Sequence, residues 1–277
     1  MNAFEEYNLW ARIASGDSRW AWELGELIEI KNDPEEIRSR FSGRLAFGTG
    51  GIRELSGVGS TRMNRFTVRR ITMGLCRWLL EKDPQARHKG VLVVRDSRTD
   101  SLLLAEETTR ILHSQGFQVY LPGEPRPTPL LSFGVRYLGC AAGVVITASH
   151  NPAGYNGYKV YDHRGVQLLP DQARVLENRI PPVDFQESVI PGGAVRNPDK
   201  ELCEAYLKML SENLSGSQDG GPVVCYSPLH GAAGDLMEKA FQALGYRHFQ
   251  VVEEEFCPDG RFPGLKVPNP EDPDSFN

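Results

Sequence analysis

The sequence has no long apolar run. Its longest, Cys140–Ala148, is interrupted by Gly143 and Thr147, whereas a membrane-spanning helix needs ~18 or more consecutive apolar residues. The first ten residues carry Glu5 and Glu6 instead of a basic segment followed by an apolar stretch, which argues against a signal peptide. The sequence therefore predicts a protein with no membrane partner.

Cysteines are few and widely spaced. There are five, an odd number, and none forms a CxxC pair, which argues against a metal framework and a disulfide scaffold. We expect free thiols, mostly buried as small apolar side chains, in a reducing, cytoplasmic location. The five are Cys76, Cys140, Cys203, Cys225 and Cys257.

An excess of positive charge is also missing. Lys and Arg number 31 against 36 Asp and Glu, a net charge of −5. Nucleic acids and anionic membranes attract proteins through a positive field, so we expect no nucleic-acid partner. Hydrophobic residues make up 40% and charged residues 24% of the 277 positions, an ordinary globular composition with room for one large domain, or one domain and part of another.

Helical and strand patterns alternate along most of the chain. The first forty residues read as helical, with Asp33 before Pro34 as a good helix start. Residues 42–62 hold six glycines and are predicted to be loop. Short apolar strands at Val91–Arg95, Gln118–Leu121 and Ala141–Thr147 follow, separated by helices, which is typical of a parallel sheet covered on both faces.

We therefore predict an α/β fold with a mixed, mainly parallel sheet sandwiched by helices. The expected organisation is a helical N-terminal extension (residues 1–40), a first domain (41–195) and a second α/β domain (196–277). The second domain offers strand, helix and strand patterns up to Glu253 but no periodic pattern from Cys257 onward. We expect it to be incomplete, since two strands and one helix make a marginal sheet.

The segment Thr147–Pro152 follows a predicted strand, where sheets of this kind present side chains to a cleft. It contains Ser149 next to His150. A serine there can act as a nucleophile when neighbouring groups assist proton transfer. An ordinary turn built on Asn151-Pro152 explains the same residues, and both interpretations stay open.

Two further segments carry suitable chemistry for phosphate. Phe47–Arg53 is rich in glycine and ends in an arginine, so backbone N–H groups and a guanidinium could meet an anion; a flexible loop is the alternative. Lys159 lies in the aromatic strand pattern Tyr155–Asp162. It could act on a hydroxyl proton or pair with phosphate, or simply protect an edge strand.

Together these segments resemble one family, the α-D-phosphohexomutases of the phosphoglucomutase/phosphomannomutase group. The resemblance rests on the order and spacing of Phe47–Arg53, Asp96–Arg98, Thr147–Pro152 and Asn156–Lys159. It covers the chain from about residue 40 to its end.

The resemblance implies a reversible transfer of phosphate between O1 and O6 of a hexose phosphate, through a hexose 1,6-bisphosphate that also serves as activator. Ser149 would be the phosphoserine, and its phosphate would be a ligand of the family's Mg²⁺. His150 would assist proton transfer, Lys159 would be the general acid and base, and Arg53 would stabilise the transferred group. The implied phosphate-binding residues are Thr49, Gly50, Gly51, Arg98 and Asn151.

One feature of the family is missing. Family members hold Mg²⁺ with an Asp-x-Asp-x-Asp-Arg segment, and this sequence has none. We expect an N-terminal half of a mutase, inactive by itself, whose partners are a hexose phosphate and either the missing C-terminal half or a second copy. The alternatives are a non-catalytic protein that binds a phosphosugar or a partner, and a serine hydrolase, which the lack of a Gly-x-Ser-x-Gly elbow disfavours.

Overall fold

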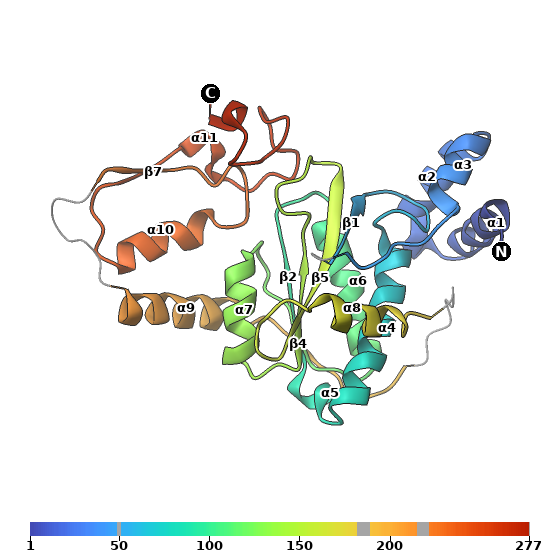
Figure 1. The fold of residues 1–277 in the computed structure, drawn as a ribbon, viewed down its shortest axis with the longest axis horizontal. Coiled ribbons are helices and arrows are strands. Elements are labelled where there is room, and N and C mark those ends of the chain that lie inside the picture. The colour runs from blue at the N-terminus through green and yellow to red at the C-terminus, as the bar shows by residue number, and fades with distance from the viewer. Residues whose placement is uncertain (49–50, 182–188, 215–221, 277) are drawn as a thin grey trace.

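The structure is a computed structural model that describes residues 1–48, 51–181, 189–214 and 222–276. In this part of the chain a six-stranded sheet with the order β1-β5-β4-β2-β3-β6 forms the centre, and a two-stranded sheet, β7-β8, lies apart from it. Figure 1 shows the large sheet between α7 and the group α4, α6 and α8, with the N-terminal helices on one side and the small sheet with α10 on the other.

The strands confirm the predicted fold class. β2 pairs in parallel with β3 and β4, and β3 pairs in parallel with β6, whereas β5 is antiparallel to both β4 and β1. The small sheet is parallel. The strands are β1 (Ile52–Leu55), β2 (Val91–Arg95), β3 (Val119–Tyr120), β4 (Ala142–Ile146), β5 (Tyr155–Asp162), β6 (Val195–Arg196), β7 (Val224–Tyr226) and β8 (Phe249–Val251).

Two of the helices begin after residues whose side chains are typical helix caps. Asn64 caps α4 by accepting the N–H of Thr67, and Asp33 caps α3 in the same way through Glu35 and Glu36. The α-helices are α1 (Ala3–Ser15), α2 (Ala21–Ile30), α3 (Pro34–Phe41), α4 (Arg65–Lys82), α5 (Ala86–Lys89), α6 (Ser101–Ser114), α7 (Thr128–Tyr137), α8 (Pro170–Glu177), α9 (Asp199–Asn213), α10 (Gly234–Ala243) and α11 (Glu253–Phe256).

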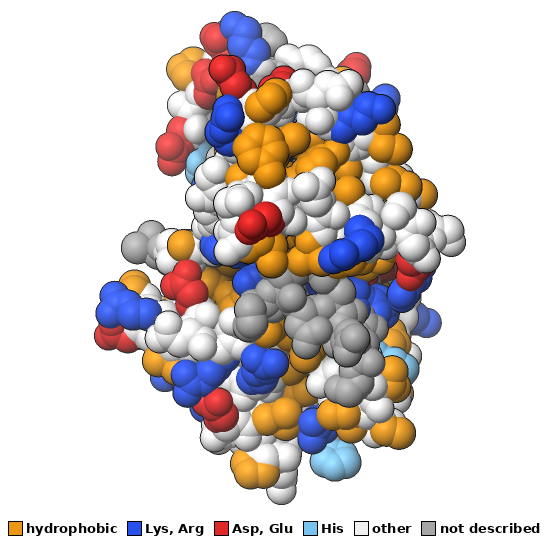
Figure 2. Space-filling view, turned by 90° about the vertical axis from the view of Figure 1, so that its right-hand side faces the viewer, with side chains coloured by type: hydrophobic (Ala, Val, Ile, Leu, Met, Phe, Trp, Pro, Cys, Tyr) orange, Lys and Arg blue, Asp and Glu red, His pale blue; other side chains and the backbone are white. Residues whose placement is uncertain are grey.

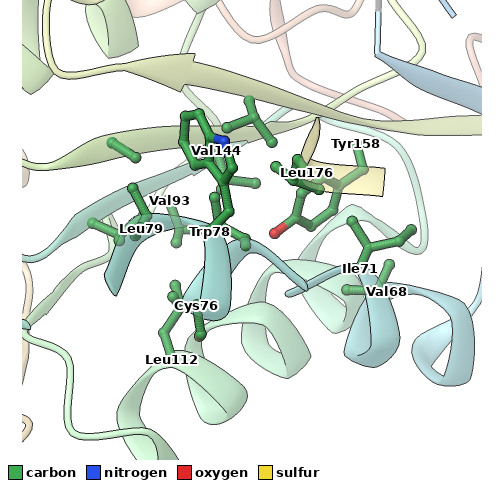
Figure 3. Packing of buried hydrophobic residues seen from close by; sticks show 14 of the residues in the cluster. Val68, Ile71, Cys76, Trp78, Leu79, Val93, Leu112, Val144, Tyr158 and Leu176 are labelled. Atoms are coloured by element: carbon green, nitrogen blue, oxygen red, sulfur yellow. The ribbon is translucent and has the colours of Figure 1, made fainter. Parts of the chain in front are cut away.

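Strand β2 is buried on both faces of the sheet. Val91 and Val93 pack into the cluster formed with α4, α6 and α8, and Leu92 and Val94 pack into the cluster formed with α7. Side chains alternate between the two faces of a strand, so an unbroken apolar run is what a strand covered by helices on both sides requires. Figure 3 shows the first cluster, where Trp78 and Leu79 of α4 reach the sheet near Val93 and Val144.

The predicted N-terminal extension is helical and packs on the first domain. Its apolar cluster joins Trp10 and Trp20 to Phe66 at the start of α4. The Trp20 and Phe66 rings stack with centroids 4.2 Å apart. The carboxylate of Glu23 is fully buried and accepts from Arg65. A buried charge needs a partner of this kind, so α2 is fixed to α4.

An ion-pair cluster joins the first domain to α9 and α10. Arg126 precedes α7 and is 5% exposed. Its Nε and Nη2 donate to Asp199 of α9 at 2.7 Å each, and its Nη1 donates to both oxygens of Asp235 in α10 at 2.8 and 3.0 Å. The hydrogen bonds to these two carboxylates raise the pKa of Arg126. The cluster therefore holds the second α/β unit in a defined place.

Several expectations need correction. The predicted loop 42–62 contains a strand, β1, because its residues pair with β5. The sequence also predicts a hairpin of Gly157–Asp162 and Gly165–Leu169; its turn forms, but the second arm makes only a single bridge, Tyr161 to Gln167. All five cysteines are free, yet only Cys76 and Cys140 are buried, and burial raises the pKa of each of these two thiols to about 12.

The sequence also predicts a Gly- and Ser-containing linker at 215–221 and a proline-rich stretch at 181–191. The linker and residues 182–188 of that stretch lie outside the described residues. Among the described residues, no helix has both the length and the apolar character to cross a membrane.

On the face shown in Figure 2, hydrophobic side chains gather in the upper half among charged ones. Exposed apolar residues of the N-terminal helices include Phe4, Trp22 and Ile28.

Candidate active site

Ser149 lies in the loop that follows β4. The residue is exposed, whereas Thr147 and Ala148 before it are buried. Its φ is +59°, in the left-handed region that residues with a side chain rarely adopt. The N–H of Ser149 donates to Oγ1 of Thr147 at 2.9 Å. The loop thus presents a hydroxyl to solvent on a constrained backbone, which is a feature of functional sites.

His150 offers only a weak contact to Ser149. Its Nδ1 lies 3.5 Å from Oγ of Ser149, a distance at which a hydrogen bond is weak. The His150 side chain is itself exposed. The pair therefore lacks the short, oriented geometry of a nucleophile and its base, and the structure gives the hydrolase alternative no support.

Arg98 fixes the Ser149 loop. Its side chain is fully buried, and all five of its N–H groups have acceptors within the protein. The sequence predicted that Arg98 binds phosphate; in this structure no N–H is left for one, and the guanidinium holds the loop instead. The acceptors are Oδ2 of Asp96 (3.1 Å) and the carbonyl oxygens of Ser149 (3.0 Å), Asn151 (2.6 Å), Pro152 (2.7 Å) and Tyr155 (2.8 Å).

A second buried network fixes the start of β5. The position of Asp100 just before the helical pattern of α6 predicts a helix cap, but its carboxylate makes no cap hydrogen bond. It accepts instead from Oγ of Ser56 and from Nδ2 of Asn156, both at 2.6 Å. Asn156 is fully buried, and its Oδ1 accepts the N–H of Gly157 at 2.8 Å. The strand that carries Lys159 is therefore anchored to α6 and to the end of β1.

Arg53 lies on β1, directly across from Gly157 of β5. Its Nη1 donates to Oδ1 of Asn151 at 2.7 Å, which connects β1 to the Ser149 loop. Lys159 is two residues beyond Gly157, so its side chain emerges on the same sheet face as that of Arg53, on the diagonal. The structure thus brings Arg53, Lys159 and the Ser149 loop together, as the sequence predicted.

Gly157 has a steric reason to be glycine. A Cβ there would lie 2.5 Å from the carbonyl oxygen of Thr147 and 2.6 Å from that of Ile52. The N–H of Thr147 also donates to the carbonyl of Gly157 at 3.1 Å. The missing side chain therefore allows β1, β5 and the end of β4 to approach closely.

Lys159 is half-buried and electrostatically perturbed. Its pKa is lowered, first by desolvation and then by the positive charge of Arg53, while Asp96 acts in the opposite direction. Burial and a neighbouring positive charge both disfavour the protonated ammonium, whereas a neighbouring negative charge favours it. A lysine with a lowered pKa loses its proton more readily, which suits proton transfer at a hydroxyl.

The glycine-rich segment is only partly described. Thr49 and Gly50 lie outside the described residues. Gly51 has a φ of +94°, and a Cβ there would lie 2.7 Å from the carbonyl oxygen of Tyr158. Its N–H donates to the carbonyl of Gly48 at 3.3 Å. Gly51 therefore serves close packing against β5, and its N–H does not point to a free anion.

A cleft of about 410 Å³ lies beside Ser149 and His150. One wall comes from the carboxyl ends of β2 and β4, and the other from the β7–α10 loop (227–233) with Phe262, Pro268 and Pro270. Its volume falls in the range of small-molecule sites. In the β7–α10 loop, Leu229 and His230 also have left-handed φ values of +48° and +58°, so both walls contain constrained backbone.

The residues around Ser149 do not fit a Mg²⁺ site. Mg²⁺ demands several oxygen ligands in octahedral geometry. Both oxygens of Asp96 accept from Arg98 or Ser101, and both oxygens of Asp100 accept from other side chains. Within the described ranges, no three His, Cys, Asp or Glu side chains gather as a metal site would require.

Two family models match this chain. The model for phosphoglucomutase/phosphomannomutase α/β/α domain I matches residues 44–187, and the model for α/β/α domain II matches residues 204–277. The chain belongs to the phosphoglucomutase/phosphomannomutase family. The resemblance found in the sequence is thereby confirmed.

Relatives of known name agree with this family. The chain is 35% identical to a phosphoglucomutase from Staphylococcus saprophyticus over 251 residues, which is 87% of this chain and 45% of that protein. A phosphoglucomutase from Staphylococcus aureus strain RF122 is 33% identical over 248 residues, 87% of this chain and 44% of that one. The chain thus spans less than half the length of these curated relatives.

A solved structure shares the fold. The crystal structure of a phosphoglucomutase/phosphomannomutase family protein from Burkholderia thailandensis matches with a TM-score of 0.63 and 26% sequence identity. The match covers 79% of this chain and 46% of that one. The mixed sheet and its helices are therefore those of the family.

Sequence reasoning missed the residues that support the site. Asp100 and Asn156 were not recognised as a pair, because their side chains meet across 56 positions of sequence. Arg126 was not singled out either, although it lines the cleft. One feature of the sequence could have indicated the contact between Asp100 and Asn156. An aspartate before a helix and an Asn-Gly step in a strand are both places where a polar side chain needs a hydrogen-bond partner.

Proposed function

We propose that this chain supplies the phosphoserine part of a phosphohexomutase. In the full reaction, Oγ of Ser149 takes a phosphoryl group from a hexose 1,6-bisphosphate, forming an O–P bond at the serine as the sugar O–P bond breaks. The serine proton leaves with the sugar oxygen or to solvent. In the other half of the cycle, the phosphoserine gives its phosphoryl group to the free hydroxyl of a hexose monophosphate, and Ser149 then takes the phosphoryl group from the opposite oxygen of the bisphosphate so formed. The sum interconverts hexose 1- and 6-phosphates.

One observation carries this proposal: an exposed serine on a left-handed backbone in a loop that Arg53 contacts, with Lys159 on the same sheet face as Arg53. Phosphoryl transfer needs positioning and charge stabilisation more than covalent chemistry. Arg53 supplies a fixed positive charge. Lys159, with its lowered pKa, is the group that exchanges a proton with the attacking sugar hydroxyl.

The chain by itself does not complete this cycle in our proposal. The sequence contains no Asp-x-Asp-x-Asp-Arg segment, and the carboxylates of Asp96 and Asp100 are engaged in hydrogen bonds. In this proposal the remaining ligands for Mg²⁺ are supplied by another stretch of polypeptide or by a second protein. The site we propose is cytoplasmic and acts on a hexose phosphate.

A coupled assay and a titration test the proposal. The purified chain should convert glucose 1-phosphate to glucose 6-phosphate at no measurable rate, yet bind glucose 1-phosphate in isothermal titration, and R53A should weaken that binding. Substantial turnover by the chain alone would contradict its dependence on further ligands. Absence of binding would contradict the site itself. R174A, which changes an exposed arginine in α8, is the control for the loss of one positive charge.

Binding without phosphoryl transfer to Ser149 would favour the alternative, a non-catalytic phosphosugar-binding protein. The S149A variant separates the two. If the chain is a binding protein, S149A should bind glucose 1-phosphate as the wild type does. In a mutase part it should abolish the acceptance of phosphate.

A further inference from the structure

A second cavity lies at the opposite end of β4 from Ser149. It has a volume of about 690 Å³ and is bordered by Ala141, directly before β4, and by Asp162, the last residue of β5. Asp162 pairs with Ala142 at the start of β4, whereas Ser149 follows its end. The cavity therefore shares no wall with the Ser149 cleft, and its volume is in the range of small-molecule sites.

The floor of this cavity is apolar and buried. Trp78 and Leu79 of α4 are each 3% exposed, and Ala141 is 7% exposed. The indole Nε1 of Trp78 is buried and makes no hydrogen bond in the described structure. An indole N–H usually finds an acceptor when it is buried, and Nε1 of Trp78 is an exception within the described residues.

The rim carries more donors than acceptors. Asp83 accepts from Nζ of Lys89 at 2.7 Å, and Oδ2 of Asp162 accepts from Nε and Nη2 of Arg164 at 2.9 and 2.7 Å. Both carboxylates are thus paired. The amide oxygen of Gln172 also accepts, from the N–H of Leu169 at 3.1 Å.

Lys82 supplies the excess charge. Its Nζ lies 4.2 Å from the centre of the Trp78 ring, and within the described structure it forms no ion pair with a carboxylate. Arg164 uses two of its five N–H groups on Asp162, which leaves three for another acceptor. His163, the neighbour of Arg164 along the chain, also lines the cavity and adds a further basic group.

We propose that this cavity binds a small organic phosphate. Its phosphate group would accept from Lys82 and Arg164, and its carbon part would lie on Trp78, Leu79 and Ala141. A phosphate monoester suits the cavity because it brings acceptors and negative charge to a rim that has spare donors and spare positive charge. The site is independent of the chemistry at Ser149.

The indole N–H of Trp78 gives a local readout. The chain has four tryptophans, and none of the residues that line the Ser149 cleft is a tryptophan. In a ¹H–¹⁵N spectrum of the full chain, glucose 6-phosphate or adenosine monophosphate should shift the Trp78 signal saturably, and at lower concentration than inorganic phosphate does. Neutral glucose should leave it in place. Loss of one of the four indole signals in W78F assigns the resonance.

The K82A variant tests the proposed recognition. It removes an exposed side chain without an ion pair, so the fold should persist, and the apparent Kd for the organic phosphate should rise roughly tenfold, the effect of one charge-assisted hydrogen bond. K31A, at the end of α2, should leave the Kd unchanged. Isothermal titration of wild type and K82A gives the same comparison if W78F fails to fold.

Three results would overturn the proposal: no saturable shift with either organic phosphate, equal affinities for inorganic and organic phosphate, or binding that K82A does not weaken. None of them bears on Ser149, because a failure at this cavity leaves the binding of glucose 1-phosphate beside Ser149 as it was.

Discussion

Nη1 of Arg53 lies 2.7 Å from Oδ1 of Asn151 and donates a hydrogen bond to it. This contact joins β1, at the edge of the sheet, to the loop that carries Ser149. It also places the guanidinium two residues from the serine along that loop. A phosphoryl group bound at Ser149 would therefore meet a guanidinium that is already held in position. This lowers the entropic cost of bringing the charge and the phosphoryl group together.

The buried guanidinium of Arg98 should be essential for the Ser149 loop. R98A leaves Oδ2 of Asp96 and four carbonyl oxygens without their donor, so we expect a loss of about 3–5 kcal/mol in the free energy of unfolding. Lysine cannot reproduce the five-donor geometry, so R98K should recover only part of the loss. Urea unfolding followed by circular dichroism measures both variants.

R174A is the matched control for R98A. Arg174 is 73% exposed, and its contact with Asp171 is 4.0 Å long. We expect a change below about 0.5 kcal/mol, as for most surface pairs. If R98A were as mild as R174A, the assignment of Arg98 as the support of the loop would be wrong.

A methyl group at position 157 should separate the strands of the site. In G157A the new Cβ meets two backbone carbonyl oxygens at 2.5 and 2.6 Å, and backbone cannot move aside as a flexible side chain can. We expect a destabilisation of about 1–3 kcal/mol, measured by urea unfolding. G25A is the control: that glycine lies in α2, where an added Cβ would have no other atom within 4 Å, so it should stabilise the protein by roughly 0.5–1 kcal/mol.

The lowered pKa of Lys159 predicts a pH-dependent effect on stability. Keeping Lys159 protonated destabilises the folded protein, so this cost is complete below the folded pKa and disappears as the pH rises through it towards the unfolded value. K159M should therefore be more stable than the wild type near neutral pH, and the gain should shrink at high pH. Urea unfolding at a series of pH values measures this; a gain that grows with pH would contradict the prediction.

Removing the charge of Arg53 should raise the pKa of Lys159. Because desolvation is the larger cause, the pKa in R53Q should stay below that of an ordinary lysine. An NMR titration of ¹³C-methylated lysines reports it directly. An unchanged pKa in R53Q would mean that the two side chains do not interact across the face of the sheet.

Arg126 should control how firmly the second α/β unit is held. R126Q leaves two carboxylates, Asp199 and Asp235, without their shared partner, so amide hydrogen exchange in α10 should accelerate while exchange in β2 stays slow. The control is K239A, which removes a more exposed partner of the same Asp235 at 3.4 Å. Equal effects of the two variants would show that Arg126 has no special role.

Periodicity was sufficient to predict the central elements. The apolar runs of β2 and β4 and the capped start of α4 at Asn64 follow from local rules, and the structure confirms them. The strand β1 could not be predicted in the same way. It has four residues among many glycines and is a strand only because it pairs with β5, about a hundred positions away.

The same limit applies to the candidate site. Ser149, Arg53 and Lys159 could be selected from their motifs, and the fold brings them together. The role of Arg98 could not be predicted. From sequence alone, a basic residue near an expected phosphate site is interpreted as a phosphate ligand, and only the structure shows that this one is buried. Its four carbonyl acceptors belong to residues 149–155, and backbone carbonyls leave no trace in the sequence.

The most direct test of the central claim is the transfer of a labelled phosphoryl group to Ser149. The purified chain is incubated with ³²P-labelled glucose 1,6-bisphosphate and Mg²⁺, and the labelled peptide is identified by mass spectrometry. We predict slow labelling of Ser149 that does not exceed one phosphate per chain, because the chain carries no complete Mg²⁺ site, with less label in R53A and none in S149A. Label on another residue, or equal labelling of S149A and the wild type, would contradict the account, as would a chain that binds the bisphosphate and never accepts its phosphate.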